Sequence, residues 1–346
     1  MPSVKLLIST VLAVWGGAAL VVVAQADTAA AHRAVARNLA GKDWPGLLRS
    51  ICPEPPAPGA AAARGAAPEA ARGRGAAPAA PAARQNPPRD QWHKEPVKVF
   101  DNLYFLGQTE YSAWAVNTSD GIIIIDTIFD YSVEDEVVGG LKKMGLDPAK
   151  IKYVIVSHGH GDHVGGAKFL QDTYKARVLM SAADWDLLDR GNPNTSRPRR
   201  DMVVTDGMKL TLGGTTITMF LTPGHTPGTI STIVPVTDNG RPHVMAEWGG
   251  TGFNFTVTPD RPREYWFRSY IQSAQHFLAA ARAAGADGMI ANHLNLDESK
   301  DKLPKLAERK PGDPHPYVVG TEAVQRYLTI AEECAKGGLA ELEGRK

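Results

Sequence analysis

The segment formed by residues 157–163 limits what this chain can fold into more than any other feature of its sequence. It reads Ser-His-Gly-His-Gly-Asp-His and ends an apolar, β-branched run that starts at residue 151 and predicts a buried strand. The turn carries four potential metal ligands: His158, His160, Asp162 and His163. Because burying four such polar groups is costly unless they share a partner, the pattern predicts a metal centre, and these ligand types suit zinc.

The spacing of these ligands indicates two adjacent metal ions. His158 and His160 are two residues apart and can point the same way, whereas Asp162 and His163 turn toward a neighbouring point. Four ligands do not complete two sites, so further histidines are expected. His225 stands in a Pro/Gly-rich loop at residues 222–228, and His293 follows an apolar run, each at a predicted strand end. The remaining histidines lack such settings: His32, His93, His243, His276 and His315.

The region around this cluster predicts one globular domain over residues 91–346. Short strand-like runs at residues 97–100, 103–106, 111–117 and 122–125 alternate with turn signals. Ser132 is expected to cap a helix that ends at Gly145, and residues 321–342 show helical spacing of apolar side chains.

The chain before this domain divides into three parts. Residues 1–26 have the pattern of an export signal, which predicts a periplasmic or secreted protein; an uncleaved membrane anchor is the alternative. Residues 27–52 predict one or two short helices. Residues 53–90 are dominated by Ala and Pro with scattered Arg, cannot build a core, and are interpreted as a linker.

Charge and cysteine content limit which partners and which disulfide states the protein can have. Lys plus Arg number 38 against 37 Asp plus Glu, which argues against nucleic-acid binding. The two cysteines, Cys52 and Cys334, are compatible with one disulfide or with two free thiols. A small-molecule substrate and a monomer are expected, with membrane contact only through an uncleaved N-terminal segment.

Taken together, residues 157–163, residues 222–228 and His293 resemble the metallo-β-lactamase superfamily, and within it most closely the third subclass of class B enzymes. The resemblance extends over about residues 92–342. It implies an α+β fold, the αββα sandwich in which two mixed β-sheets pack face to face with helices outside. It also implies a metal-dependent hydrolase with two Zn²⁺ ions.

Carried over residue by residue, the resemblance assigns the ligands to two zinc ions. The first would be held by His158, His160 and His225, and the second by Asp162, His163 and His293. Three protein ligands leave an open position on each ion, as in catalytic zinc sites. A water shared by the two ions would be the nucleophile, and Asp162 would orient it as the catalytic residue.

Residues 243–251 depart from a common pattern of the superfamily. Many of its hydrolases place a bridging aspartate there, and this chain has none, which argues against a glyoxalase II or lactonase. Glu247 is the nearest acid; a structural role or a role supporting the ligands is favoured over coordination or exposure. Where the subclass offers serines to the substrate, this chain has Thr251 and Asn254 as candidates. Asp126 and Ser157 are expected to brace the metal turn.

The leading hypothesis is therefore a zinc hydrolase that opens a cyclic amide such as a β-lactam. A zinc hydrolase of lactones, thioesters or other esters is the first alternative. An exported metal-binding module with little catalysis is the second, motivated by the irregular stretch at residues 248–250.

Overall fold

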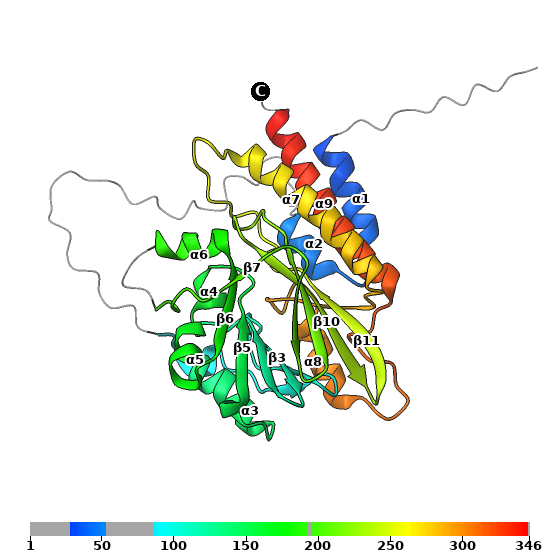
Figure 1. Ribbon diagram of the computed structural model, residues 1–346. Coiled ribbons are helices and arrows are strands. Elements are labelled where there is room, and N and C mark those ends of the chain that lie inside the picture. Colours follow the sequence, from blue (N-terminus) through cyan, green and yellow to red (C-terminus); the bar gives the residue numbers. More distant parts are fainter. Residues whose placement is uncertain (1–27, 53–85, 192–195, 345–346) are drawn as a thin grey trace, which may run out of the picture.

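The computed structural model describes residues 28–52, 86–191 and 196–344 (Figure 1). The predicted export signal and most of the predicted linker lie outside the described residues. Within the described part of the chain, no helix has the length and apolar character needed to cross a bilayer.

The first β-sheet is mixed and has the spatial order β1-β2-β3-β4-β5-β6-β7. Neighbours are antiparallel from β1 to β4 and parallel from β4 to β7. Its strands are β1 (Val97–Lys98), β2 (Leu103–Phe105), β3 (Trp114–Thr118), β4 (Gly121–Ile125), β5 (Ile151–Ile155), β6 (Arg177–Ser181) and β7 (Met202–Val204). In β4, Ile123 and Ile125 face the second sheet while Ile122 and Ile124 face the outer helices. The strand is apolar throughout because both of its faces are buried.

The second sheet has the order β12-β11-β10-β9-β8 and is antiparallel except for the parallel pair β11 and β12. Its strands are β8 (Met208–Leu212), β9 (Thr215–Leu221), β10 (Ile230–Asp238), β11 (Arg241–Glu247) and β12 (Gly288–Ile290). Residues such as Phe105 and Trp114 from the first sheet and Val234 and Met245 from the second form the core between the sheets.

Helices cover both outer faces, which confirms the αββα sandwich (Figure 1). The first sheet is covered by α3 (Gly139–Lys143), α4 (Gly161–Val164), α5 (Ala167–Tyr174) and α6 (Ala182–Asp189). The second is covered by α7 (Arg263–Ala283) and α9 (Thr321–Glu343), together with α1 (Ala29–Ala40) and α2 (Pro45–Ile51). Shorter elements are α8 (Ser299–Glu308), a π-helical turn η3 (Glu134–Val138), and the 3₁₀ turns η2 (Arg89–Gln91) and η4 (Pro148–Lys150).

Two local predictions were wrong. Ser132 does not cap a helix with its side chain, because its hydroxyl donates to the carbonyl of Phe129 at 3.2 Å. The helical segment that follows consists of the π-helical turn η3 and then α3. The strand predicted to begin at Tyr111 begins at Trp114; Tyr111 instead forms an isolated β-bridge with His293.

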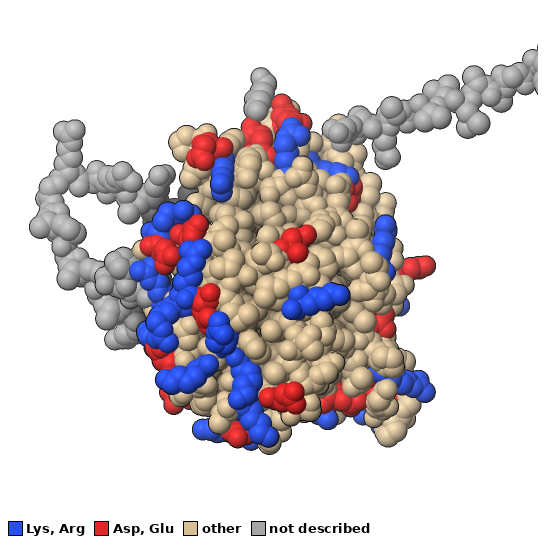
Figure 2. Space-filling model, viewed as in Figure 1, with Lys and Arg blue, Asp and Glu red and all other residues tan. Residues whose placement is uncertain are grey.

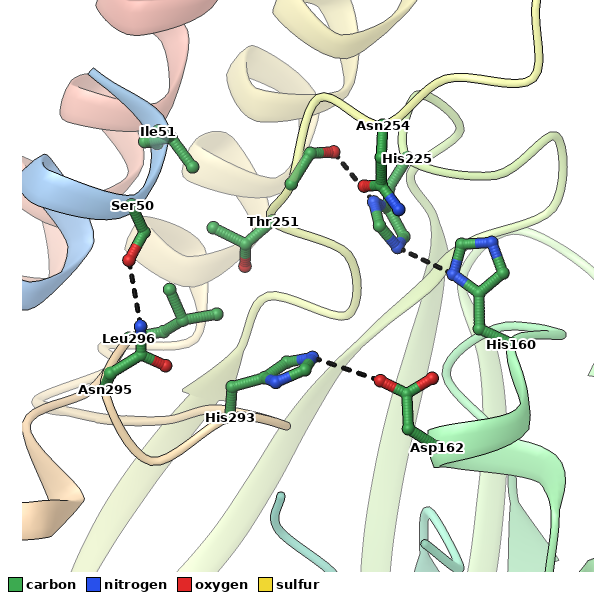
Figure 3. Close-up of a pocket in the computed structure, with 11 residues that line it drawn as sticks. Ser50, Ile51, His160, Asp162, His225, Thr251, Asn254, His293, Asn295 and Leu296 are labelled. Atoms are coloured by element: carbon green, nitrogen blue, oxygen red, sulfur yellow. Dashed lines mark hydrogen bonds and ion pairs between the residues drawn. The ribbon is translucent and has the colours of Figure 1, made fainter. Parts of the chain in front are cut away.

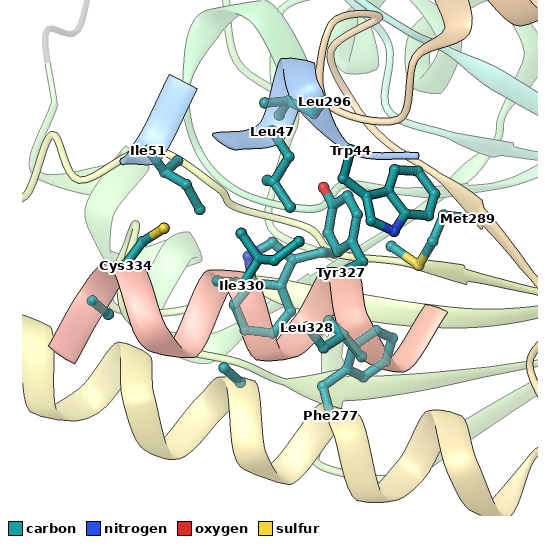
Figure 4. Close-up of a cluster of buried hydrophobic side chains, with 14 of the residues drawn as sticks. Trp44, Leu47, Ile51, Phe277, Met289, Leu296, Tyr327, Leu328, Ile330 and Cys334 are labelled. Carbon is teal, nitrogen blue, oxygen red and sulfur yellow. The ribbon is translucent and has the colours of Figure 1, made fainter. Parts of the chain in front are cut away.

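The N-terminal helices are attached to the rest of the structure. α1 and α2 pack on α9, and Trp44 and Leu47 are buried in the same cluster as Tyr327 and Phe277 (Figure 4). A disulfide joins Cys52 to Cys334 in α9, which decides between the two states that the sequence left open.

Basic side chains on the side that carries α5 and α6 are interleaved with acids (Figure 2). Arg177 pairs with Asp201 at 2.6 Å, and Arg200 pairs with Asp186 at 2.6 Å. The charges of Arg177 and Arg200 are therefore compensated locally.

Candidate metal centre

The six predicted ligands come from three places along the chain and meet in space. Figure 3 shows four of them, His160, Asp162, His225 and His293, around one cavity. The turn after β5 and the short helix α4 carry four of them. His225 lies in the loop between β9 and β10, and His293 follows β12. The six side chains form two triads, in each of which the potential ligand atoms lie within 4.8 Å of one another. The first triad is His158, His160 and His225; the second triad is Asp162, His163 and His293.

The first triad brings imidazole nitrogens close together. His225 Nε2 lies 3.1 Å from His158 Nε2 and 3.0 Å from His160 Nδ1. The outer nitrogens bond to the backbone: Nδ1 of His158 lies 2.8 Å from the carbonyl of Gly249, and Nδ1 of His225 lies 2.7 Å from the carbonyl of Gly252. Each Nδ1 must donate to its carbonyl, so each Nε2 carries a lone pair directed into the triad.

This arrangement fits a cation. Burial lowers the pKa of His225 to about 3 and holds the pKa of His158 well below its ordinary value, so both rings are neutral near pH 7. Two lone pairs that face each other cannot form a hydrogen bond. A positive ion between them removes the conflict, and three neutral imidazoles are a ligand set that zinc accepts.

The second triad is built around Asp162. Its Oδ2 lies 3.2 Å from His163 Nε2 and 3.6 Å from His293 Nε2. His163 Nε2 is buried and faces the Asp162 carboxylate as an ion pair rather than as a well-directed hydrogen bond. Burial lowers the pKa of His293 to about 4. Burial also opposes protonation of His163, but the charges of Asp126 and Asp162 outweigh it and raise its pKa to about 10.

Asp126 supports the second triad from behind. Its Oδ2 lies 2.8 Å from His163 Nδ1, and it accepts from the Ser157 backbone N–H and the Ser157 hydroxyl, each at 2.7 Å. The residue has a φ of 56°, in the left-handed region that non-glycine residues rarely adopt. The expectation that Asp126 and Ser157 brace the metal turn is thus confirmed.

A cavity of about 390 Å³ opens beside both triads. Both candidate substrate contacts, Thr251 and Asn254, line it (Figure 3). The hydroxyl of Thr251 is buried rather than exposed to the cavity. The cavity has room for a small substrate next to the metal ligands.

Glu247 is not a ligand of either triad. Its side chain is fully buried, and its Oε2 accepts from the Thr232 hydroxyl at 2.7 Å. Burial, reinforced by the charge of Asp126, raises its pKa to about 8, so this carboxyl is predominantly protonated at neutral pH. The structural role favoured from the sequence agrees with this position.

The glycines at residues 249 and 250 are needed by the first triad. A Cβ on Gly250 would lie 2.7 Å from the Cβ of His225, and one on Gly249 would lie 1.7 Å from the carbonyl oxygen of Ile230. The irregular stretch at residues 248–250, which motivated the hypothesis of a metal-binding module with little catalysis, is therefore a place where the backbone passes close to a ligand.

Sequence reasoning missed Asp184 in α6, which joins the two ligand loops. Its Oδ2 accepts from the Gly159 N–H and the Thr226 hydroxyl, each at 2.8 Å, and its Oδ1 accepts from the Gly228 N–H at 2.7 Å. Burial raises its pKa to about 6. In the sequence it appears only as an acid in the first turn of a helix, a position that many exposed acids occupy.

Comparison of the sequence with known proteins identifies relatives of part of the chain. The model of the metallo-beta-lactamase superfamily matches residues 106–238. A hydroxyacylglutathione hydrolase of Acidiphilium cryptum is 34% identical over 82 residues, which are 24% of this chain and 30% of that protein. The chain spans 30%, 46% and 38% of the first curated relatives that it matches, less than half of each.

Solved structures match over a longer range. BJP-1, a subclass B3 metallo-β-lactamase of Bradyrhizobium japonicum, is 25% identical with a TM-score of 0.61, covering 73% of this chain and 97% of that one. The native FEZ-1 metallo-β-lactamase from Legionella gormanii is 23% identical with a TM-score of 0.61 and the same coverage. Residues 106–238 thus match the metallo-β-lactamase superfamily, and the solved structures whose fold the chain shares include subclass B3 enzymes.

Proposed function

We propose that the protein is a dinuclear zinc hydrolase that opens a cyclic amide such as a β-lactam. The observation that carries this proposal is the meeting of two three-ligand groups at one open cavity. Three protein ligands leave each ion a position for water or substrate, which distinguishes catalytic from structural zinc. A metal-binding module without catalysis has no use for a substrate-sized cavity beside its ligands.

The residues of the chain prepare the site for hydrolysis. The chemistry that zinc supplies when bound is Lewis acidity and a lowered pKa of water. Asp162 would orient the attacking water as an ionised carboxylate, because the charge of His163, against the cost of burial, holds the pKa of Asp162 well below its ordinary value. Thr251 and Asn254 would form part of the wall against which the substrate lies.

The cyclic amide is favoured over an ester by what the segment after β11 provides. Residues 248–251 contribute backbone and a threonine to the site and no carboxylate, while Glu247 is turned into the core. Each triad is thus completed without a shared aspartate. The resemblance to subclass B3 structures supports the same choice.

A second candidate is hydrolysis of thioesters, lactones or other esters. It is favoured by the similarity to a hydroxyacylglutathione hydrolase over the 82 matched residues. Both candidates require the same two triads and differ only in the bond that is cleaved.

For the setting of this reaction we retain the proposals made from the sequence. Residues 1–26 would direct the protein to the periplasm or outside the cell, and the enzyme would act as a monomer on a small molecule.

Turnover of a chromogenic cephalosporin at full zinc loading, compared with a lactone and a thioester, tests the proposal. The wild type should hold about two zinc ions, and His225→Ala and His293→Ala about one each, with hydrolysis lost in both. His276→Ala is the matched control, because this exposed histidine pairs with Asp206 away from the triads. Lactone or thioester turnover without cephalosporin turnover would replace the first candidate by the second, and no zinc-dependent turnover of any substrate would refute both.

A further inference from the structure

One wall of the metal cavity comes from a segment that precedes the sandwich in the sequence. Ser50 and Ile51, at the end of α2, line the cavity across from Asp162 (Figure 3). The Ser50 hydroxyl accepts a hydrogen bond from Asn295 Nδ2 at 2.9 Å. A substrate bound at the triads would therefore lie beside the N-terminal segment as well as the sandwich.

We propose that residues 28–52 form the substrate-selecting wall of this cavity and receive an apolar substituent of the substrate against Ile51 and Leu296. This proposal rests on the hydrolase activity proposed above. The neutral residues Thr251 and Asn254 line the same cavity, and no Lys or Arg lines it among the described residues. Selection on the side of α2 therefore depends on shape and apolar contact rather than on charge.

The wall is anchored in the core at its first end. Trp44 is fully buried, its Nε1 donates to the carbonyl of Ala323 at 2.8 Å, and its ring packs edge-on against Tyr327 with centroids 5.0 Å apart (Figure 4). Leu47 is buried in the same cluster. These contacts fix α2 against α9 before it reaches the cavity.

α2 also lies directly against the loop that follows His293. A Cβ on Gly46 would lie 2.0 Å from the carbonyl oxygen of Asn295, so only glycine permits this approach. This contact fixes the position of α2 relative to Asn295, which lies two residues after the ligand candidate His293.

The second end of the wall is covalently held. Cys52 follows Ile51 directly and forms the disulfide with Cys334. Both cysteines are buried. Ile51, the last residue of α2, is therefore held by the packing of the helix before it and by the disulfide after it. Breaking the disulfide should loosen the cavity end of α2 while Trp44 keeps the start of the helix attached.

The contact with the substrate is tested by Ile51→Ala in the full chain. Leu48→Ala is the matched control, because Leu48 stands on the same helix and packs on the same core without lining the cavity. The probes are two substrates with the bond that the wild type cleaves, one with a methyl and one with a benzyl acyl group. We expect Ile51→Ala to lower the ratio of kcat/KM for benzyl over methyl about tenfold, mainly through KM, because the benzyl group loses an apolar contact that the methyl group does not reach, and Leu48→Ala to leave it within about twofold.

Equal ratios in the wild type and Ile51→Ala, at unchanged zinc content, would overturn the proposal. Equal shifts in both variants would also overturn it, because they would show general loosening of α2 rather than loss of one contact.

The covalent anchor is tested without turnover. The zinc-loaded wild type and a Cys52→Ser/Cys334→Ser variant are mixed with excess 4-(2-pyridylazo)resorcinol, and zinc transfer is followed by absorbance. If the wall restricts access to the triads, the variant should release zinc at least about fivefold faster with an unchanged circular dichroism spectrum. Equal rates would refute the anchored wall. Because this measurement needs no substrate, it separates failure of the wall from failure of the proposed function.

Discussion

The two triads hold their histidines in different ways. In the first triad, His158 and His225 are oriented by the backbone carbonyls of Gly249 and Gly252 and are neutral. In the second triad, the orienting group behind His163 is the carboxylate of Asp126. The first triad therefore depends on the path of the backbone, and the second depends on a buried charge.

The difference predicts which changes each triad tolerates. A backbone carbonyl cannot be removed by mutation, so the first triad is vulnerable to whatever shifts the loops that carry it. The second can be weakened by one side-chain change that leaves the backbone in place. Outer contacts of this kind commonly affect metal affinity by about 10–100-fold.

Asp126→Asn should give the largest effect. Asparagine tolerates the left-handed φ of this position and keeps a similar shape, but it removes the charge behind His163. We expect zinc affinity of the second triad to fall about 100-fold while that of the first changes little, as measured by titration calorimetry that resolves two binding events. Equal weakening of both events would show that the triads do not have separate supports.

Gly250→Ala should affect the opposite triad. The new methyl would meet His225, and the ring would have to move. We expect about a tenfold loss of affinity at the first triad with the second preserved. Gly161→Ala is the control, since a Cβ there meets no atom within 4 Å. Equal loss of zinc affinity at the first triad in Gly250→Ala and Gly161→Ala would contradict the role of Gly250.

Asp184→Asn should weaken the first triad by a smaller factor, about threefold to tenfold, because the amide keeps one acceptor while facing the remaining N–H with a donor. Asp186→Asn serves as control; this exposed residue of the same helix pairs with Arg200. Zinc content after dialysis against a zinc-buffered solution measures the change. An unaltered zinc content in Asp184→Asn would show that Asp184 is not needed to join the ligand loops.

Glu247→Gln should change neither triad, only the pH dependence of stability. The folded pKa of about 8 lies above the ordinary value of 4.5, so between these values the folded protein binds more protons than the unfolded chain. The resulting stability is complete below pH 4.5 and is lost as pH rises through about 8. Urea unfolding of zinc-depleted protein should show the wild type losing up to about 1.4 kcal/mol per pH unit relative to the variant. Parallel curves would contradict the raised pKa.

The sequence was sufficient to predict the sandwich and to group the six ligand candidates, because residues 157–163, residues 222–228 and His293 carry a family resemblance that implies both. The strand-like runs and the glycine-rich turn are local signals that agree with it. The sequence was insufficient for Asp184, whose partner Gly228 lies 44 residues away and leaves no mark in periodicity. The same holds for Ile51. The sequence of residues 27–52 predicts one or two short helices but does not indicate which surface they pack on, and no local signal places Ile51 at the metal cavity.

The disulfide closes residues 52–334 into a covalent ring that contains every metal ligand candidate. A protease that cuts once anywhere inside this ring leaves both pieces tied through sulfur. Nicked enzyme would therefore migrate as an intact chain on a non-reducing gel and separate into fragments only after thiol treatment, so survival of the full-length band is a poor measure of an unbroken backbone.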